Sequence, residues 1–248
     1  MEGLKTYFAS DFHLGLAAAT DPREREQRVT GWLDRVSADA AAIWLLGDVF
    51  DFWWEYREVI PKGFTRFLGR ISALTDRGIE VHMFTGNHDM WMKDYLAQEC
   101  GVTVHYEPLV TRIGGELFYL AHGEGLGTRS IGGRLLFAVF RSPISRFIFS
   151  AIHPRWGVAI GHAWSRHSRL AKHASLPFMG EEREDLIRHT RSVAAGGCTA
   201  KYFIYGHRHL PLTFDEEGRR MIILGDWFSS RESYAVFDGK ELTLVNIE

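Results

Sequence analysis

Five short apolar segments, spread along most of the chain, constrain its fold more than any other feature of the sequence. Each has the length of a β-strand and ends in glycine or polar residues; they occupy residues 7–10, 42–46, 79–85, 117–121 and 202–205. Such runs are typical of buried strands whose carboxyl ends meet at one edge of a sheet. The sequence therefore predicts an α/β protein with ligand chemistry where these strands end.

The stretches between and after these segments complete the expected architecture. Residues 21–36 and 61–76 are expected to be helical; in the second, Pro61 suits an early helical position and Gly78 a terminating one. Residues 212–247 alternate between apolar and polar positions around the turn signals EEG and DG, which predicts antiparallel strands. The fold is thus expected to contain a mixed sheet system.

The composition indicates a folded protein of one or two domains. The 248 residues are 46% hydrophobic and 24% charged, which excludes a disordered chain, a coiled coil and a collagen-like repeat. The net charge of −2 argues against a general electrostatic trap for nucleic acid. Two cysteines outside any paired motif and the absence of a signal-like start predict a reduced, cytoplasmic setting. No segment reaches the roughly 18 uninterrupted apolar residues of a spanning helix, so any membrane contact is expected at the surface.

One segment departs from the rest of the chain in charge. Residues 125–180 contain seven arginines, one lysine and no acidic residue. The same segment is rich in aromatic side chains, namely Phe137, Phe140, Phe147, Phe149, Trp156, Trp164 and Phe178. Two or three helices fit it, with prolines as interruptions. We therefore expect a core formed by residues 1–124 and 181–248, with residues 125–180 as a basic, aromatic helical insertion.

Each of the five predicted strands is followed by a short polar motif. In chain order these motifs are Asp11-Phe12-His13, Gly47-Asp48-Val49-Phe50-Asp51, Gly86-Asn87-His88-Asp89, His122-Gly123 and Gly206-His207-Arg208-His209. In an extended segment, the i, i+2 spacing of the Asp11/His13 and His207/His209 pairs places both side chains on one side. Carboxylates, imidazoles and an amide carbonyl suit divalent transition metals, and two ions about 3.5–4 Å apart activate water and neutralise a phosphoryl group. The motifs predict metal-assisted hydrolysis of a phosphate ester or anhydride.

In this order, the motifs resemble the D-x-H, GD-x-x-D, GNH-D/E, H and GH-x-H pattern of the calcineurin-like metallophosphoesterase family. The resemblance implies a four-layer α/β/β/α sandwich with two divalent ions at its edge, manganese being preferred, and a bridging hydroxide that attacks phosphorus. It further implies that one metal is held by Asp11, His13, Asp48 and His209 and the other by Asp48, Asn87, His122 and His207.

Three further motif residues receive supporting roles from the same resemblance. His88 is expected beside the ions, where it stabilises transition-state charge or, as the second choice, acts as a general acid. Asp89 is expected to orient His88, and Asp51 to support its loop rather than bind metal.

Within this family, the chain is similar to the pyrophosphatases of lipid A synthesis that act on UDP-2,3-diacylglucosamine. The likeness is carried by SDFHLG, GDVFDFWWEY, GNHDMW, HGEGLG and the insertion that follows; His88 stands where proteobacterial members typically have arginine, which indicates a GNHD-type branch. The likeness implies hydrolysis to UMP and 2,3-diacylglucosamine 1-phosphate, beneath a helical lid that covers the acyl chains and docks on the inner membrane. It also implies substrate contacts from Asn87, His88, Arg166, Ser168, Arg169 and Lys172. The expected location is cytoplasmic and peripheral to the inner membrane, without a nucleic-acid or protein partner.

Some alternatives stay open at this level. The chain could hydrolyse another nucleotide diphosphate or a phosphodiester, whereas an inactive scaffold should have lost ligands, and all seven are present. The basic insertion could be a solvated helical face, although its complete lack of acids favours a phosphate or membrane role. An aromatic cluster fits core packing and a substrate wall equally well, and consists of Phe50, Phe52, Trp53, Trp54 and Tyr56.

Overall fold

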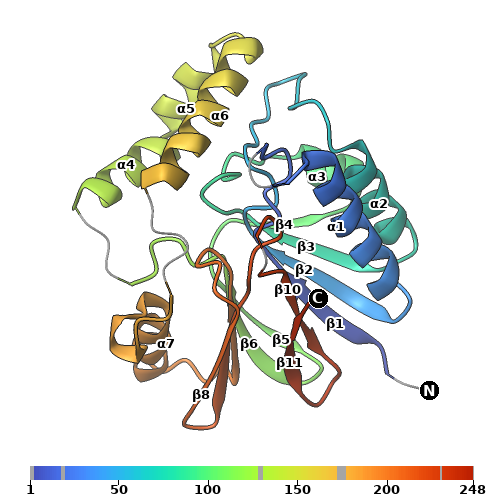
Figure 1. Cartoon of the computed structure of the whole chain (residues 1–248), viewed down its shortest axis with the longest axis vertical. Helices are drawn as coiled ribbons and strands as arrows, with labels where there is room; N and C mark the ends of the chain where they lie inside the picture. The colour runs from blue at the N-terminus through green and yellow to red at the C-terminus, as the bar shows by residue number, and fades with distance from the viewer. Residues whose placement is uncertain (1–2, 18–19, 128–130, 172–176, 230, 248) are drawn as a thin grey trace.

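Two β-sheets packed face to face, with helices on their outer sides, form the main body of the molecule (Figure 1). The computed structural model describes residues 3–17, 20–127, 131–171, 177–229 and 231–247. Within this part of the chain the layers follow the order helices, sheet, sheet, helix. The predicted four-layer α/β/β/α architecture is confirmed.

The first sheet has six strands in the order β11-β10-β1-β2-β3-β4. Their bounds are β1 Lys5–Ala9, β2 Ala40–Leu46, β3 Glu80–Phe84, β4 Thr103–His105, β10 Ser233–Phe237 and β11 Leu242–Asn246. Strands β1 to β4 are parallel, whereas β10 and β11 are added antiparallel at the side of β1. The register pairs Ala9 with Leu45 and Leu46 with Phe84, so β1, β2 and β3 end almost level at one edge.

The second sheet has five strands in the order β5-β6-β7-β9-β8. Their bounds are β5 Leu109–Ile113, β6 Glu116–Ala121, β7 Tyr202–Tyr205, β8 Leu212–Glu216 and β9 Arg219–Ile223. Strands β6, β7 and β9 are parallel, and Ala121 pairs with Tyr205, so β6 and β7 also end side by side. The expected C-terminal antiparallel strands are present, but β8 and β9 pair in this sheet while β10 and β11 pair in the other.

The central strands are mostly apolar, and both of their faces are buried. In β1, Tyr7 and Ala9 face the helices on the outer side of the first sheet, whereas Phe8 packs between the two sheets. The ring of Phe8 stacks on that of Phe118 from the second sheet, with ring centroids 5.7 Å apart. This double burial holds the two sheets together and fixes the relative positions of their strand ends.

Helices α1 (Pro22–Val36), α2 (Thr65–Asp76) and α3 (Tyr95–Cys100) cover the first sheet, and α7 (Asp185–Ala195), preceded by a short 3₁₀ turn (Glu181–Arg183), covers the second. The expected start of α2 at Pro61 is wrong, because Gly63 and Phe64 adopt positive φ angles of 112° and 59° and turn the chain first. The carboxylate of Glu26 on α1 accepts hydrogen bonds from the first amides of α2, those of Arg66 and Phe67. A cap from another helix therefore sets this boundary.

Three helices, which we call the lid helices, lie outside the four layers (Figure 1). They are α4 (Ile131–Arg141), α5 (Pro143–Ser150) and α6 (Pro154–Ala171), and the prolines that were expected as interruptions are the first residues of α5 and α6. None of the described helices is long and apolar enough to cross a membrane. The lid helices lie beyond the edge at which the strands of both sheets end (Figure 1).

Candidate metal centre

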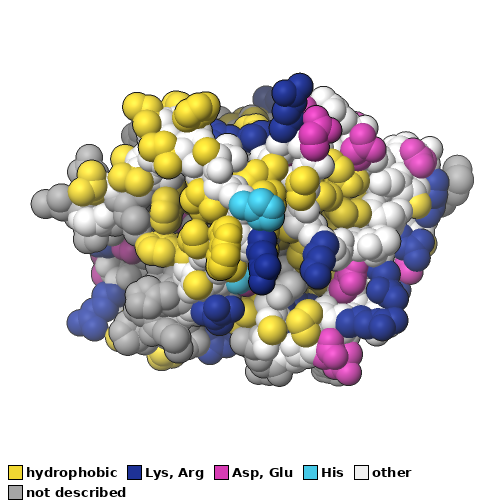
Figure 2. Space-filling view, turned by 90° about the horizontal axis from the view of Figure 1, so that it is seen from above, with side chains coloured by type: hydrophobic (Ala, Val, Ile, Leu, Met, Phe, Trp, Pro, Cys, Tyr) yellow, Lys and Arg dark blue, Asp and Glu magenta, His cyan; other side chains and the backbone are white. Residues whose placement is uncertain are grey.

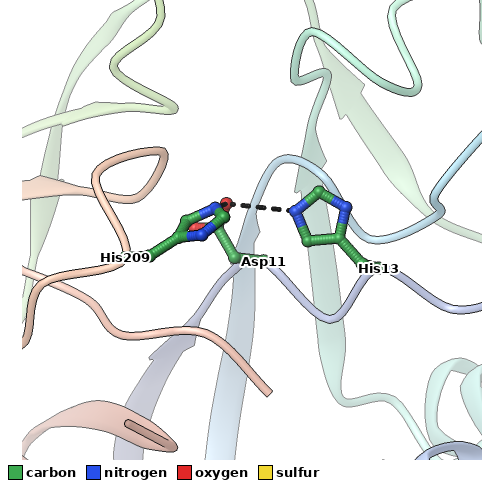
Figure 3. Close-up of side chains that lie close together, drawn as sticks. All are labelled: Asp11, His13 and His209. Atoms are coloured by element: carbon green, nitrogen blue, oxygen red, sulfur yellow. Dashed lines mark hydrogen bonds and ion pairs between the residues drawn. The ribbon is translucent and has the colours of Figure 1, made fainter. Parts of the chain in front are cut away.

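The polar motifs after β1, β2, β3, β6 and β7 converge at this common edge. Ligand atoms of the described residues lie within 4.8 Å of one another in three clusters, two of which consist of expected ligands: Asp11, His13 and His209 form the first group, and Asp48, His122 and His207 the second. The third cluster, His13, Asp51 and His88, shares His13 with the first group. In the first group, the Asp11 carboxylate lies between the two imidazoles, 3.0 Å from Nε2 of His209 and 3.8 Å from Nε2 of His13 (Figure 3). Each of these two groups brings together three of the four residues of one expected ligand set.

Asp48 connects the two groups. Its Oδ2 atom lies 3.7 Å from Nε2 of His13 and 3.3 Å from Nε2 of His122. Its Oδ1 atom accepts a hydrogen bond of 2.8 Å from the amide of His88, which fixes the orientation of the carboxylate. One oxygen of Asp48 thus faces both groups, which is the position that a ligand shared by two ions requires.

His122 is held in the tautomer that metal binding needs. Its Nδ1 lies 2.7 Å from the carbonyl oxygen of Leu46, so the Nδ1–H group donates to that carbonyl. The other ring nitrogen, Nε2, is therefore the lone-pair side of the neutral ring, and it faces Asp48. A histidine ligand is commonly oriented by such a hydrogen bond from its second nitrogen.

Several polar atoms of the expected ligands are buried without a hydrogen-bond partner among the described residues. They are both ring nitrogens of His13, Oδ1 of Asn87 and Nε2 of His122. A buried polar atom without a partner costs about 1–3 kcal/mol, so a cluster of them in one place calls for a missing ligand. Nitrogen and oxygen donors of this kind suit a divalent transition metal, and the residues present fit a pair of such ions.

The electrostatics of the site also favour cations. Burial raises the pKa of the Asp11 and Asp48 carboxyls, but nearby histidines, chiefly His209 for Asp11 and His122 for Asp48, outweigh it and hold both pKa values far below normal. Conversely, burial lowers the pKa of His13 and His122, but the carboxylates raise the pKa of each to about 10. Bound divalent ions would replace the protons that the raised pKa values keep on His13 and His122 beside the carboxylates.

The backbone at the strand ends is strained. Of the seven described non-glycine residues with positive φ, five are expected metal ligands: Asp11 at 56°, His13 at 44°, Asp48 at 51°, His207 at 65° and His209 at 51°. Such conformations cost roughly 1–2 kcal/mol per residue and persist where surrounding structure imposes them. The extended backbone expected for the two i, i+2 pairs is therefore wrong, since left-handed turns rather than strand geometry direct these side chains into the site.

Three motif glycines make room for ligands that come from other motifs. A Cβ atom would collide with a ligand side chain at each position: Gly47 with His122, Gly86 with Asp48, and Gly206 with Asp11. At Gly86 the added atom would overlap Oδ1 of Asp48 and lie 2.5 Å from its backbone nitrogen. These glycines allow strand ends from both sheets to approach closely enough to form one site.

His88 lies next to the two groups, but its partners differ from those expected. The Asp89 carboxylate accepts hydrogen bonds from the amides of Gly86 (2.7 Å) and Phe50 (3.1 Å), so it supports the two loops, and the expectation that it orients His88 is wrong. Burial and the charge of Asp48 raise the pKa of Asp89 to about 7. Nδ1 of His88 instead lies 3.1 Å from the backbone oxygen of Asp51.

The Asp51 side chain connects the site to the lid helices. Its Oδ1 atom lies 3.6 Å from Nδ1 of His13 and accepts a hydrogen bond of 2.8 Å from the hydroxyl of Ser165 on α6. The same hydroxyl lies 3.0 Å from Nδ1 of His88. Asp51 therefore does more than support its own loop, because it contacts a ligand histidine and a lid helix together.

An apolar pocket of about 210 Å³ extends from the site to the lid helices. Asn87 and His88 line its polar end, and Phe140, Phe149 and Trp164 line the lid side. The aromatic cluster after β2 divides between the two roles that were open. Phe50 and Trp53 are buried in the core, while Phe52 and Trp54 line the pocket.

The substrate-binding residues expected on the lid are only partly placed. Arg166 lies exposed on α6. Ser168 and Arg169 belong to α6, but their side chains lie outside the described part of the chain, as does the whole of Lys172. Arg146, which is not among the expected substrate-binding residues, lines the pocket.

Arg25 is a functional residue that the sequence did not reveal. It is fully buried on α1, and its guanidinium donates to the carbonyl oxygens of His13 (2.8 Å) and Leu16 (3.0 Å) and to the hydroxyl of Thr20 (2.8 Å). It thereby holds the strained turn that carries His13. A single arginine in an amphipathic helix is usually a solvated cation, and no local sequence pattern distinguishes Arg25 from such a residue.

Comparisons with known proteins agree with this geometry. The model of the family described as calcineurin-like phosphoesterase matches residues 4–211. The chain is 41% identical to a UDP-2,3-diacylglucosamine hydrolase of Porphyromonas gingivalis, with 98% of each chain covered. It is 27% identical to a protein of the same name from Nitrosococcus oceani, covering 90% of this chain and 88% of that one. The solved structure of an archaeal phosphodiesterase has a TM-score of 0.50 at 12% identity, covering 98% of this chain and 100% of the other, which shows a shared fold.

Proposed function

This chain belongs to the calcineurin-like phosphoesterase family, and on that basis we propose that it hydrolyses the pyrophosphate of UDP-2,3-diacylglucosamine to UMP and 2,3-diacylglucosamine 1-phosphate. The two hydrolases compared above carry this substrate in their names, and this chain covers 98% and 88% of their lengths. The reaction is a phosphoanhydride hydrolysis at the edge where the five motifs meet.

The pocket beside His88 is the observation that favours an acylated substrate over an unacylated one. One end meets the polar site at Asn87 and His88, where a diphosphate fits, and the other is walled by aromatic rings of the lid helices. Burial of an acyl chain contributes about 0.8 kcal/mol per methylene, so such a wall distinguishes acylated from unacylated substrates. A soluble sugar nucleotide alone would leave this apolar end unused.

Two divalent ions fit the site, and we propose manganese as the metal. The residues that would hold them are Asp11, His13, Asp48 and His209 for one ion and Asp48, Asn87, His122 and His207 for the other. When bound, such ions supply a nucleophile from water and neutralise charge on the phosphoryl group.

The remaining site residues act on the substrate. His88, at the polar end of the pocket, stabilises charge that develops on the phosphoryl oxygens. The leaving group is a sugar phosphate, which needs little protonation, so general acid catalysis by His88 is secondary. We propose that Asn87 and His88 contact the phosphates and the glucosamine. Further contacts with both groups come from four residues of the lid, Arg166, Ser168, Arg169 and Lys172.

We propose that residues 125–180 form a lid over the acyl chains. The same segment would hold the protein at the cytoplasmic side of the inner membrane. Large apolar side chains protrude from the lid helices, including Ile144 and Phe147, which are 72% and 78% exposed. In the view from above, hydrophobic side chains gather on the part of the surface where the lid helices lie, and basic side chains border them (Figure 2). Apolar side chains next to arginines suit the interface of an anionic bilayer.

The test is incubation of the purified protein with UDP-2,3-diacylglucosamine and Mn²⁺ in detergent, with UMP detected as the product. UMP should be released in a metal-dependent way, and unacylated UDP-glucosamine should be a poor substrate. The His122→Ala variant controls for contaminating hydrolases. Equal rates on both sugar nucleotides, or release of a nucleotide other than UMP from the acylated one, would contradict the proposal.

A further inference from the structure

Ser165 on lid helix α6 lies against the catalytic side of the site. Its side chain is buried, with 2% of its surface exposed. Its hydroxyl donates to Oδ1 of Asp51 at 2.8 Å and lies 3.0 Å from Nδ1 of His88. A residue of the lid thus contacts two residues that belong to the strand-end motifs.

The hydrogen-bonding capacities of these groups determine where the protons lie. An ionised carboxylate only accepts, so the single hydroxyl proton of Ser165 is directed to Asp51. The hydroxyl oxygen then accepts from Nδ1–H of His88, and the backbone oxygen of Asp51, 3.1 Å from Nδ1, accepts from the same group. This arrangement places a proton on Nδ1 of His88 and excludes the tautomer that carries its only proton on Nε2.

Small residues on α6 allow Ser165 to reach the site. Gly157, Gly161 and Ser165 recur every four residues, so they share one face of the helix, and all three are buried. A Cβ atom at Gly161 would overlap the ring of Phe52, and one at Gly157 would overlap Oη of Tyr56. The helix backbone therefore lies directly on the loop that follows β2, and this brings the Ser165 hydroxyl within hydrogen-bonding distance of Asp51.

We propose that Ser165 is a positioning residue for His88. Together with Asp51 it holds Nδ1 of the imidazole as a hydrogen-bond donor and fixes the orientation of the ring, so that Nε2 is the nitrogen that faces the phosphoryl group and, in the doubly protonated ring, donates to its oxygens. Because Gly161 and Trp164 of the same helix line the acyl pocket, α6 connects that pocket to His88 through Ser165. This inference rests on the proposed function, since it assigns the action of His88 to a diphosphate beside that pocket.

The test is a double-mutant cycle on the full chain with Mn²⁺. Ser165→Ala should lower kcat by about 10- to 100-fold, the range found when a hydrogen bond that orients a functional histidine is removed. KM should change by less than about threefold, because Ser165 is not among the residues that line the pocket. In the His88→Ala background, Ser165→Ala should cause no further loss, since its target is gone.

A matched control is Ser150→Ala on lid helix α5, whose hydroxyl donates to the backbone oxygen of Arg146 at 2.8 Å. This variant should retain wild-type kcat, and thermal unfolding should show that both serine variants are folded. An unchanged kcat for Ser165→Ala would overturn the inference. So would a double variant whose loss of kcat equals the product of the losses in Ser165→Ala and His88→Ala.

The same cycle separates this inference from the proposed substrate. Bis(p-nitrophenyl) phosphate, a small phosphodiester, allows turnover to be measured without acyl chains. If UMP is not released from the acylated substrate but the cycle on this phosphodiester shows the expected coupling, the proposed substrate is wrong and the role of Ser165 stands. If UMP is released at a rate that Ser165→Ala leaves unchanged, the role of Ser165 is wrong and the proposed function stands.

Discussion

Individual glycines at the strand ends determine whether a metal site can form at all. At Gly86, a methyl group would overlap Oδ1 of Asp48 and press on its backbone nitrogen, and backbone cannot move aside as cheaply as a flexible side chain. We expect Gly86→Ala to lower kcat by at least about 100-fold and the free energy of unfolding by roughly 1–3 kcal/mol. Steady-state kinetics and urea unfolding measure the two effects.

Gly69 provides the matched control for this substitution. It lies exposed on α2, where an added Cβ would meet no atom within 4 Å. Gly69→Ala should leave kcat unchanged and raise the free energy of unfolding by about 0.5–1 kcal/mol, because alanine favours the helix. Full activity in Gly86→Ala would show that the close approach of the two motifs is not required.

His122 gives a second test at the same scale. Its Nε2 is buried without a described partner and faces Asp48, while Nδ1 is held by the Leu46 carbonyl. His122→Ala should lower kcat by at least about 1,000-fold, because one ion loses a ligand and the Asp48 carboxylate loses a neighbour. Stopped assays of UMP release measure the rate, and metal analysis by mass spectrometry should show less than the wild-type metal content. A wild-type rate with metal supplied would exclude the two-ion mechanism.

The residues that meet at the strand ends could be predicted from the sequence because they follow apolar runs in a fixed order. The roles of their neighbours could not be predicted. Asp89 stands beside His88 in the chain, yet it caps backbone amides, whereas Ser165 contacts His88 from 77 residues away. Arg25 supports the turn of His13 from a helix. Such contacts depend on tertiary structure, which no local pattern encodes.

Among the elements, the strands that are buried on both faces and the C-terminal antiparallel strands could be predicted, whereas β4 and β5 could not. β7 has the predicted bounds, and β1, β2, β3 and β6 differ from the predicted bounds by one to two residues at their ends. β4 has only three residues, and β5 alternates between half-buried and exposed positions at the edge of its sheet. The start of α2 was misplaced because Glu26 on a different helix caps it.

Three neighbouring strands carry a stack of rings that should make stability depend on pH. The ring of Trp44 on β2 stacks on that of His82 on β3 with centroids 3.7 Å apart, and His105 on β4 lies beside both. Burial lowers the pKa of His82, against the opposing effect of Glu80, and burial with the nearby His82 lowers the pKa of His105. In the folded state both rings therefore resist protonation more than in the unfolded state.

The contribution of these two histidines to the free energy of unfolding should consequently fall as the pH drops below about 6.5, the ordinary pKa of histidine, because the unfolded state then binds more protons. The raised pKa values of His13 and His122, about 10, act in the opposite direction between about pH 6.5 and 10, and they do so equally in wild type and in a variant of the stack, so the difference between two such proteins isolates the stack. Urea unfolding of metal-free protein between pH 7.5 and 5.5 measures the slope. On acidification, His105→Phe should gain stability relative to wild type, and an equal pH dependence in both proteins would show that the stack contributes nothing.

The lid helices present an apolar surface that the core does not cover. Replacing Ile144 and Phe147 by glutamate should weaken binding to anionic phospholipid vesicles at least about tenfold, because burial of each side chain contributes roughly 1.5–3 kcal/mol. Vesicle co-sedimentation measures the change. As a control, Val110→Glu, at a half-exposed apolar position on the edge strand β5, should bind vesicles like wild type. Equal binding by all three proteins would place the membrane contact elsewhere.

At the scale of the whole molecule, the site exists only because two sheets pack together. Strands β1, β2 and β3 of the first sheet bring the first three motifs, and β6 and β7 of the second bring His122 and the two C-terminal histidines. The buried layer between the sheets, including the stacked rings of Phe8 and Phe118, sets their relative position. The order of motifs along the chain indicated that they would meet, but only the packing of the sheets shows that Asp48 faces both groups.

The most direct test is a crystal structure of manganese-loaded protein with anomalous data collected at the manganese edge. Two peaks should appear about 3.5–4 Å apart, with Asp48 between them. One peak should be bounded by Asp11, His13 and His209, and the other by Asn87, His122 and His207. A single peak, or manganese bound away from these seven side chains, would contradict the two-ion site from which the proposed chemistry follows.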